Sequence, residues 1–231
     1  MKRREQYREA LAGAPSWPEY LREHSGLPGP RANIELAQAA ADEGDPAMFD
    51  ALIGTDDEYL VFCGVLGLGR LLAEGQDTSA RLRDHATDAR WRVREAIATA
   101  LQRLGDADPA RLVQLAGDWA GDDDPLVQRA AAAAVCEPRL LARPETQACA
   151  LDVCVRATRW LAGLPADRRR DDDVRVLRQA LGYCWSVAVA AHPAAGLPLF
   201  LALAEVDDKD VAWIVRENGR KARLAKLLPT P

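Results

Sequence analysis

Cationic side chains recur from residue 90 onward at intervals that could form a phosphate-binding groove. They lie in successive segments of helical periodicity and in the C-terminal segment: Arg90, Arg92, Arg94, Arg103, Arg129, Arg178, Arg220, Lys221 and Arg223. If these segments are helices that line one groove, their exposed cations would point into it and contact phosphate oxygens. Positive charge at the end of a last helix also suits the helix dipole, so both interpretations stay open for Arg220, Lys221 and Arg223.

Two tryptophans lie in similar octapeptides that are 122 residues apart. Residues 88–95 read DARWRVRE and residues 210–217 read DVAWIVRE. Trp91 and Trp213 could be stacking platforms for bases or another ligand. The alternative is packing between structural repeats, and we favour it because both octapeptides place the tryptophan at the same offset.

Motifs for metal, nucleotide or nucleophile chemistry are not recognisable in the sequence. The three histidines are scattered, and the five cysteines form no C-x-x-C pair. The glycines of GVLGLG at 64–69 lie in an apolar helical run, where they indicate close helix packing rather than a phosphate loop. We therefore predict no metal, no cofactor and no catalytic residue. The cysteines, in apolar stretches, are predicted to be reduced core thiols of a cytoplasmic protein.

Carboxylates cluster where helices are expected to begin. Runs occur at residues 122–124 and 171–173, with further aspartates at 207, 208 and 210. Such side chains accept hydrogen bonds from free N–H groups at a helix start. We therefore interpret them as helix caps rather than as acid–base catalysts.

Ala- and Leu-rich segments separated by Gly, Asp and Pro predict a chain built from helices. In VREAIATALQRL at 93–104 the apolar residues share one helical face, with Asp88 as the expected cap and Gly105 as the expected end. Trp160, Tyr183 and Trp185 are expected in the core. The predicted helices span residues 3–12, 17–24, 31–43, 46–53, 57–74, 78–86, 90–104, 109–120, 125–135, 145–163, 172–191, 196–205 and 210–225.

A valine with an aspartate five positions before it marks a repeating unit. Val93, Val127 and Val215 follow this rule, and Val61 and Leu177 are weaker copies. These positions are separated by 32, 34, 50 and 38 residues, intervals typical of helix pairs stacked in an α-solenoid.

The Asp-x-x-x-x-Val-Arg pattern at residues 88–94 and 210–216, with Gln128 replacing the arginine in a third copy, resembles the HEAT-repeat family. The resemblance covers about residues 30–227. It implies an all-α, right-handed α-α superhelix of about five to six helical hairpins, whose second helices line a concave face. It also implies that loop aspartates pair with helix arginines between successive repeats, a slot that Arg94 and Arg216 would occupy. We expect a single domain over residues 1–231, with an N-terminal cap at 1–30, repeats at 31–205, and a final repeat with a basic tail at 206–231.

Composition and charge indicate a folded protein but do not identify its function. The chain of 231 residues is 48% hydrophobic and 28% charged with a net charge of −5, which indicates a folded protein and not a bulk polycation. It carries no apolar run long enough to span a membrane and no signal peptide.

We expect a non-catalytic scaffold that binds another protein on its concave face, with Arg90, Trp91, Arg129, Arg178, Trp213, Arg220, Lys221 and Arg223 as candidate contacts. A more distant resemblance to the DNA-alkylation-repeat glycosylases makes DNA binding or base excision the alternative. Acidic residues at 32–69 and basic ones beyond also suggest self-association.

Overall fold

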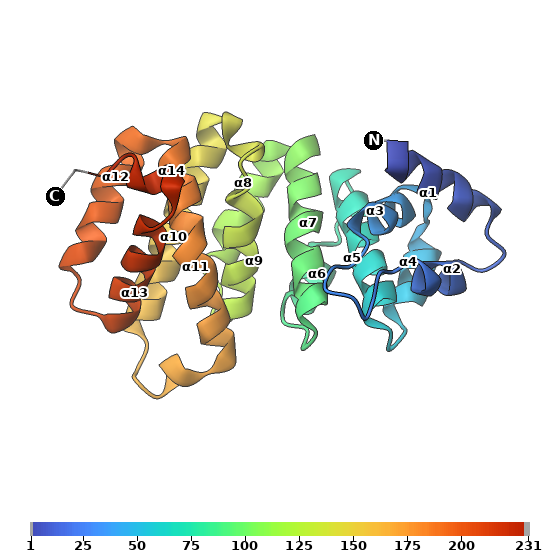
Figure 1. Ribbon diagram of the computed structural model, residues 1–231, viewed down its shortest axis with the longest axis horizontal. Helices are drawn as coiled ribbons and strands as arrows, with labels where there is room; N and C mark the ends of the chain where they lie inside the picture. Colours follow the sequence, from blue (N-terminus) through green and yellow to red (C-terminus); the bar gives the residue numbers. More distant parts are fainter. Residues whose placement is uncertain (1, 229–231) are drawn as a thin grey trace. The chain divides into compact units, whose positions relative to one another are not determined.

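The computed structural model describes residues 2–228 and divides the chain into two compact units, Met1–Ala107 and Asp108–Pro231. We call these unit 1 and unit 2 and describe each separately (Figure 1). Over residues 2–228 the regular secondary structure is helical throughout, as the sequence predicts. None of the helices in this range is long and apolar enough to cross a membrane.

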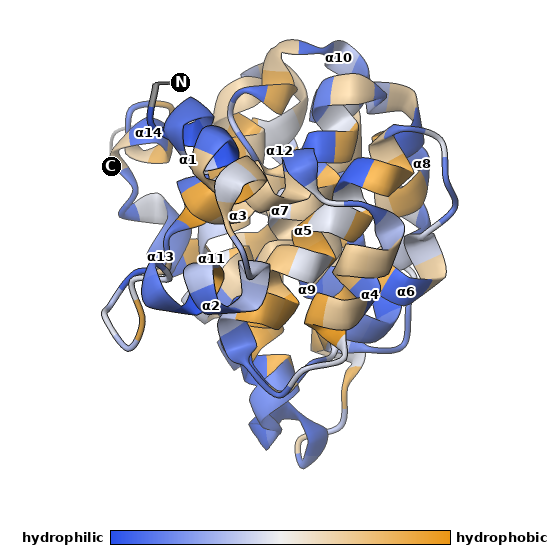
Figure 2. Ribbon diagram, turned by 90° about the vertical axis from the view of Figure 1, so that its right-hand side faces the viewer, coloured by the Kyte–Doolittle hydropathy of each residue, from blue (hydrophilic) through white to orange (hydrophobic). Residues whose placement is uncertain are grey.

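Unit 1 is arranged around α5, in which 13 of 16 residues are buried. The helices are α1 (Lys2–Gly13), α2 (Trp17–Glu23), α3 (Ile34–Glu43), α4 (Pro46–Ile53), α5 (Glu58–Ala73), α6 (Ser79–Ala86) and α7 (Trp91–Ala107). Helices α1, α3, α5 and α7 pack in that order side by side (Figure 1). Helix α4 packs against α5, and α6 contacts both α5 and α7. Figure 2 shows the contrast between the apolar α5 and the hydrophilic α1.

Glycines let the helices of unit 1 approach α5 closely. A Cβ atom at Gly67 would lie 2.3 Å from Cδ1 of Phe49, and one at Gly69 would lie 2.4 Å from Cβ of Ala100. Both distances are far below van der Waals contact. The interpretation of GVLGLG as a packing segment is therefore confirmed.

Unit 2 places α11 at its centre. The helices are α8 (Pro109–Trp119), α9 (Pro125–Val135), α10 (Pro144–Gly163), α11 (Asp172–Ala191), α12 (Pro193–Ala202), α13 (Lys209–Gly219) and α14 (Ala222–Ala225). Three short 3-10 turns are η1 (Leu140–Ala142), η2 (Arg168–Arg170) and η3 (Leu203–Glu205). Helix α11 packs against α9, α10, α12, α13 and α14.

Aspartates begin many of the helices in the manner expected. Asp57, Asp124 and Asp208 each accept hydrogen bonds from backbone N–H groups in the first turn of α5, α9 and α13. Asp88 accepts from the backbone N–H of Arg90 at 2.8 Å, directly before α7. Capping is thus confirmed for Asp124 and Asp208, whereas Asp88 bonds a backbone N–H just outside α7. The cap predicted at Asp210 is wrong, because this side chain is buried and pairs with Arg178.

Several predicted helix bounds are wrong. Helix α3 begins at Ile34 rather than at residue 31, and α12 spans Pro193–Ala202 rather than 196–205. Helix α7 continues through Gly105 to Ala107, because Gly105 is buried inside the unit rather than exposed at a terminus. The helix predicted over 210–225 is broken: α13 ends at Gly219 and α14 begins at Ala222.

The equivalence of the two octapeptides is also wrong. Helix α7 begins at Trp91, whereas α13 begins at Lys209, so Trp213 is its fifth residue. The buried third residue is Val93 in α7 and Val211 in α13, while Val215 is only half-buried. The octapeptide of α13 is therefore displaced by one helical turn relative to that of α7. Because residues one turn apart lie on the same face of a helix, the same residue types can face the core in both helices.

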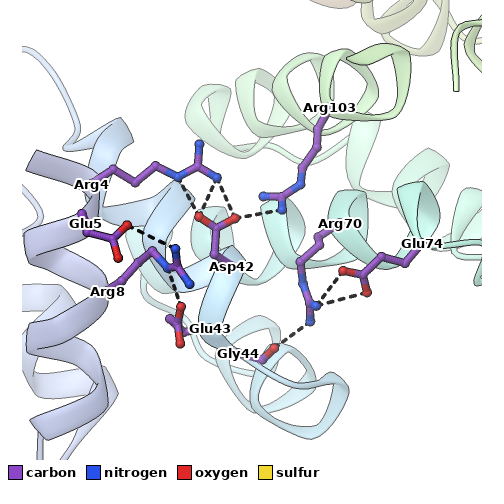
Figure 3. A network of polar contacts seen from close by, with 9 residues as sticks. All are labelled: Arg4, Glu5, Arg8, Asp42, Glu43, Gly44, Arg70, Glu74 and Arg103. Carbon is purple, nitrogen blue, oxygen red and sulfur yellow. Dashed lines mark hydrogen bonds and ion pairs between the residues drawn. The ribbon is translucent and has the colours of Figure 1, made fainter. Parts of the chain in front are cut away.

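Ion pairs neutralise much of the acidic stretch at residues 32–69. Asp42 on α3 accepts from Arg4 Nε at 2.7 Å and lies 2.8 Å from Arg103 Nη2, which joins α1, α3 and α7 (Figure 3). Arg8 contacts Glu43 beside this group. The stretch therefore presents less free negative charge than its sequence suggests.

Candidate functional site

A cavity of about 710 Å³ opens in unit 1, and we call it the unit 1 cavity. Its walls come from α1, the end of α2, the loop before α3, the first turn of α3, Phe62 of α5 and the first half of α7. The lining residues are Arg3, Tyr7, Glu23, His24, Gly26, Pro30, Arg31, Ala32, Asn33, Ile34, Glu35, Phe62, Trp91, Arg92, Glu95 and Thr99. Its volume is in the range of ordinary ligand pockets.

Asn33 fixes the loop that forms one wall of this cavity. Its Oδ1 caps α3 by accepting from the Leu36 N–H at 3.1 Å, and its Nδ2 donates to Tyr7 Oη at 2.9 Å. The Tyr59 hydroxyl donates to the Asn33 carbonyl oxygen at 2.6 Å. These bonds hold the loop in place, so the wall is formed before any ligand arrives.

Large apolar side chains stand at the mouth and on the floor. Ile34 is 50% exposed and Trp91 is 51% exposed, whereas Phe62 is buried and stacks on Tyr59. The Arg92 guanidinium lies 4.6 Å from the centre of the Trp91 ring, a cation–π contact. Exposed apolar groups beside a hollow are typical of binding sites.

Charges around the unit 1 cavity are balanced. The lining contains three arginines and three glutamates. Arg3 lies 3.5 Å from Glu35, and Arg92 donates to Glu58 at 2.9 Å. The site therefore has no preference for a polyanion.

A second hollow, of about 390 Å³, lies in unit 2 and is strongly cationic. We call it the Arg–Trp site. Its lining residues are Arg169, Arg170, Arg175, Arg178, Lys209, Asp210, Trp213 and Arg216. Five arginines and one lysine thus surround a tryptophan and a single carboxylate.

Two aspartates, the buried Asp210 and the half-buried Asp208, hold two of these arginines in place. Arg178 Nη1 donates to Asp210 Oδ1 at 2.6 Å, and Arg169 contacts both Asp208 and Asp210. Burial opposes ionisation of Asp208, but the bonds from Arg169 and from two backbone N–H groups outweigh it and lower its pKa. Arg169 also donates from Nε to the Leu164 carbonyl oxygen at 2.9 Å.

Trp213 forms the apolar wall of the Arg–Trp site. The Arg178 guanidinium lies 4.9 Å from the centre of its ring. The ring edge packs on Gly182 of α11, where a Cβ atom would come within 2.7 Å of Cζ3. The absence of a side chain at residue 182 therefore lets Trp213 lie against α11.

The other cations of the site are weakly held. Arg175 meets the exposed Asp172 at 3.2 Å, and Arg216 approaches Glu217 only to 3.8 Å. Arg170 and Lys209 are exposed and have no ion-pair partner among residues 2–228. Exposed pairs of this kind contribute little to stability, so these groups are available to a ligand.

Tyr183 and two cations form a smaller cluster on α11 and α14. Tyr183 is 44% exposed, so the expectation that it lies in the core is wrong, whereas Trp185 is fully buried as expected. The Arg223 guanidinium lies 4.8 Å from the Tyr183 ring centre and donates to its hydroxyl at 3.0 Å. The Lys221 ammonium lies 6.0 Å from the same ring.

The candidate contacts predicted from sequence separate into distinct groups. Trp91 lies at the unit 1 cavity, Arg178 and Trp213 meet in the Arg–Trp site, and Lys221 and Arg223 flank Tyr183. The remaining three do not line either hollow: Arg90, Arg129 and Arg220.

Three arginines to which the sequence assigned a candidate role make the following contacts. Arg90 donates to both carboxylate oxygens of Asp88, at 2.9 and 2.7 Å, and so supports the loop before α7. Arg216 was expected to pair between repeats, but it is exposed beside Glu217, and Arg178 pairs with Asp210 instead. Arg94 donates to the carbonyl oxygens of Asp88 and Ala89 in its own loop.

Sequence reasoning missed the outer cations of the Arg–Trp site and the unit 1 cavity as a whole. The sequence does contain an indication of these cations, because residues 168–170 are three consecutive arginines shortly before α11. No comparable signal marks the cavity, whose aromatic residues come from three separate helices.

All five cysteines are buried and free. Cys136 and Cys154 approach each other with their Sγ atoms 3.9 Å apart. Within the described part of the chain, no group of three or more His, Cys, Asp or Glu side chains could hold a metal ion.

Comparisons with protein-family models, curated proteins and solved structures returned no match.

Proposed function

We propose that the chain is a non-catalytic, HEAT-like α-solenoid that binds a segment of a partner protein in the unit 1 cavity. The observation that carries the proposal is the cavity itself, with exposed Trp91 and Ile34 at its mouth. Protein interfaces concentrate their binding energy in a few apolar or aromatic anchors that fill such pockets.

The repeat part of the proposal is supported by a common helix start. The third residue is buried in each of the five alternate helices α5, α7, α9, α11 and α13. Four of these helices are preceded by an aspartate that accepts a hydrogen bond from a backbone N–H in or just before the first turn. The five residues are Leu60, Val93, Val127, Val174 and Val211. Recurrence of one helix start at intervals of 33, 34, 47 and 37 residues is typical of stacked helical hairpins.

The choice of a protein segment as ligand follows from the balance of charge. Three arginines and three glutamates around an apolar floor suit a peptide with an apolar anchor and flanking charges of both signs. A polyanion would meet as much repulsion as attraction there. The five buried thiols fit a reducing compartment, and we include a cytoplasmic location in the proposal.

We do not extend the proposal to base excision. The carboxylate in the cationic site of unit 2 is Asp210, and it accepts from Arg178 while contacting Arg169. Both oxygens of this carboxylate are contacted by guanidinium groups, so neither points freely into the hollow toward a substrate.

Selection of displayed random peptides against the full chain tests the proposal. We expect enriched peptides to share an aromatic or aliphatic anchor and to bind about tenfold or more weakly to Trp91→Ala, the loss typical of an interface anchor. Leu201→Ala is the control, because Leu201 is also exposed, at 43%, but lies in unit 2. Failure to enrich peptides, or peptides that bind Trp91→Ala as tightly as the unaltered protein, would contradict the proposal.

A further inference from the structure

The Arg–Trp site of unit 2 carries more positive charge than its own ion pairs require. Six cations line the hollow, and only Asp210 among the lining residues is acidic. Arg169 and Arg178 already neutralise Asp210 and its neighbour Asp208. The positive charge of the other four cations is therefore available to an anionic ligand.

These four cations are arranged around a rigid base. Arg169 and Arg178 are fixed by side-chain and backbone acceptors, and Trp213 lies between α13 and α11. The outer groups are Arg170, Arg175, Lys209 and Arg216, all of them exposed or weakly paired. Guanidinium groups predominate, and their planar donors match phosphate oxygens well.

A second aromatic–cation cluster lies on the same helix as the first. Tyr183 directly follows Gly182, the residue that the Trp213 ring contacts, so α11 carries both clusters. Arg223 and Lys221 flank the Tyr183 ring. Aromatic rings alternating with cations suit a polymer in which bases alternate with phosphates, because each base can stack while each phosphate is neutralised.

We propose that unit 2 binds single-stranded nucleic acid along α11 and α13. The phosphates contact Arg170, Arg175, Lys209 and Arg216, and one base stacks on the exposed Tyr183 ring. An acidic peptide would use the cations but would gain nothing from stacking on the aromatic rings. This site is separate from the unit 1 cavity and does not depend on the function proposed for it.

Fluorescence anisotropy of a labelled single-stranded oligonucleotide with the full chain tests this site. Each phosphate contact on a single strand contributes about 0.7 to the salt slope, so four contacts predict a slope of about 2.8. The affinity should then fall about fifty-fold between roughly 50 and 200 mM salt. The absence of binding at low salt, or a slope near zero, would overturn the proposal.

Charge reversal locates the binding site. The triple variant Arg170→Glu, Arg175→Glu and Lys209→Glu should bind at least about tenfold more weakly, since three phosphate contacts become repulsive. The matched control reverses Arg143, Arg159 and Arg168, which are exposed in unit 2 and lie outside the Arg–Trp site. Equal losses in both triple variants, with helical circular dichroism intact, would show attraction by net charge alone and overturn the assignment.

Stacking and ligand class are tested with the same assay. Tyr183→Ala should weaken binding by about fivefold or more, and Tyr183→Phe should retain it, because only the ring is needed.

An oligoglutamate peptide of equal length should compete poorly with the oligonucleotide. If it binds as tightly as the oligonucleotide, the ligand is an acidic protein and the proposal is wrong. Trp91→Ala should bind the oligonucleotide normally, so failure of one proposal leaves the other testable.

Discussion

Arg178 of α11 donates to Asp210 of α13 at 2.6 Å, and the Asp210 side chain is only 5% exposed. The pair links two neighbouring helices of unit 2. It also sets the Arg178 guanidinium over the Trp213 ring, so one contact supports both the packing and the cationic site.

Asp210→Asn should destabilise the protein by roughly 3 kcal/mol, because Arg178 and Arg169 would lose the charge that compensates them in a mostly buried position. Urea unfolding monitored by circular dichroism measures the change. Asp172→Asn is the control: its side chain is 95% exposed and its pair with Arg175 should contribute less than about 1 kcal/mol. Equal effects of the two substitutions would show that the Asp210 contact does not support the fold.

Glycine substitutions should have opposite effects at two helical positions. Gly67→Ala should cost about 1–3 kcal/mol, because the added methyl group overlaps the Phe49 ring. Gly117→Ala should stabilise by about 0.5–1 kcal/mol, since a Cβ there meets no atom within 4 Å and alanine favours a helix. Thermal melting of both variants compares them, and a neutral Gly67→Ala would show that α4 and α5 are not in close contact.

Asp208 should make stability depend on pH in the acidic range. Its pKa is lowered in the folded protein, because hydrogen bonds from Arg169 and the backbone outweigh the effect of burial. The folded state therefore favours the ionised form. This contribution is present above the ordinary aspartate pKa of about 3.9 and is lost as the pH falls through the lower folded-state pKa.

Comparison of the unaltered chain with Asp208→Asn by urea unfolding at neutral and acidic pH checks this dependence. The variant should be less stable near pH 7, and the difference should shrink progressively below about pH 4. An unchanged difference across this range would show that ionisation of Asp208 does not contribute to stability.

The thiols should react slowly in the native protein. Burial raises the pKa of Cys149 to about 11, and burial also raises the pKa of Cys63. Little thiolate is present near pH 8, and the thiolate is the reactive form. Titration with a disulfide reagent should therefore detect all five cysteines only after denaturation. Rapid modification of any thiol in the folded protein would contradict the burial described.

Helix positions could be predicted from the sequence because their determinants are local. Asp124 before Pro125 and Asp208 before Lys209 cap the helices that follow them, and both are visible in the sequence. The position of the 210–217 octapeptide within α13 could not be predicted in the same way. Residues 88–95 and 210–217 share five residue types, but sequence identity over eight residues does not distinguish positions one helical turn apart.

The sites depend on contacts between distant residues, which a single sequence does not reveal. Trp213 was identified as a candidate, but its contact with Gly182 and the pairing of Asp210 with Arg178 join positions more than 30 residues apart. Tyr183 lies in a segment that is apolar almost all round, so periodicity gave no indication of its exposure.

The indole N–H signals of the six tryptophans in a ¹H–¹⁵N spectrum provide the most direct test of the binding function. Each signal can be assigned by replacing one tryptophan with phenylalanine. Addition of a selected peptide should shift the Trp91 signal and leave those of the buried Trp185 and of Trp213 in place. An unchanged Trp91 signal under saturating peptide would contradict the assignment of the unit 1 cavity as the protein-binding site.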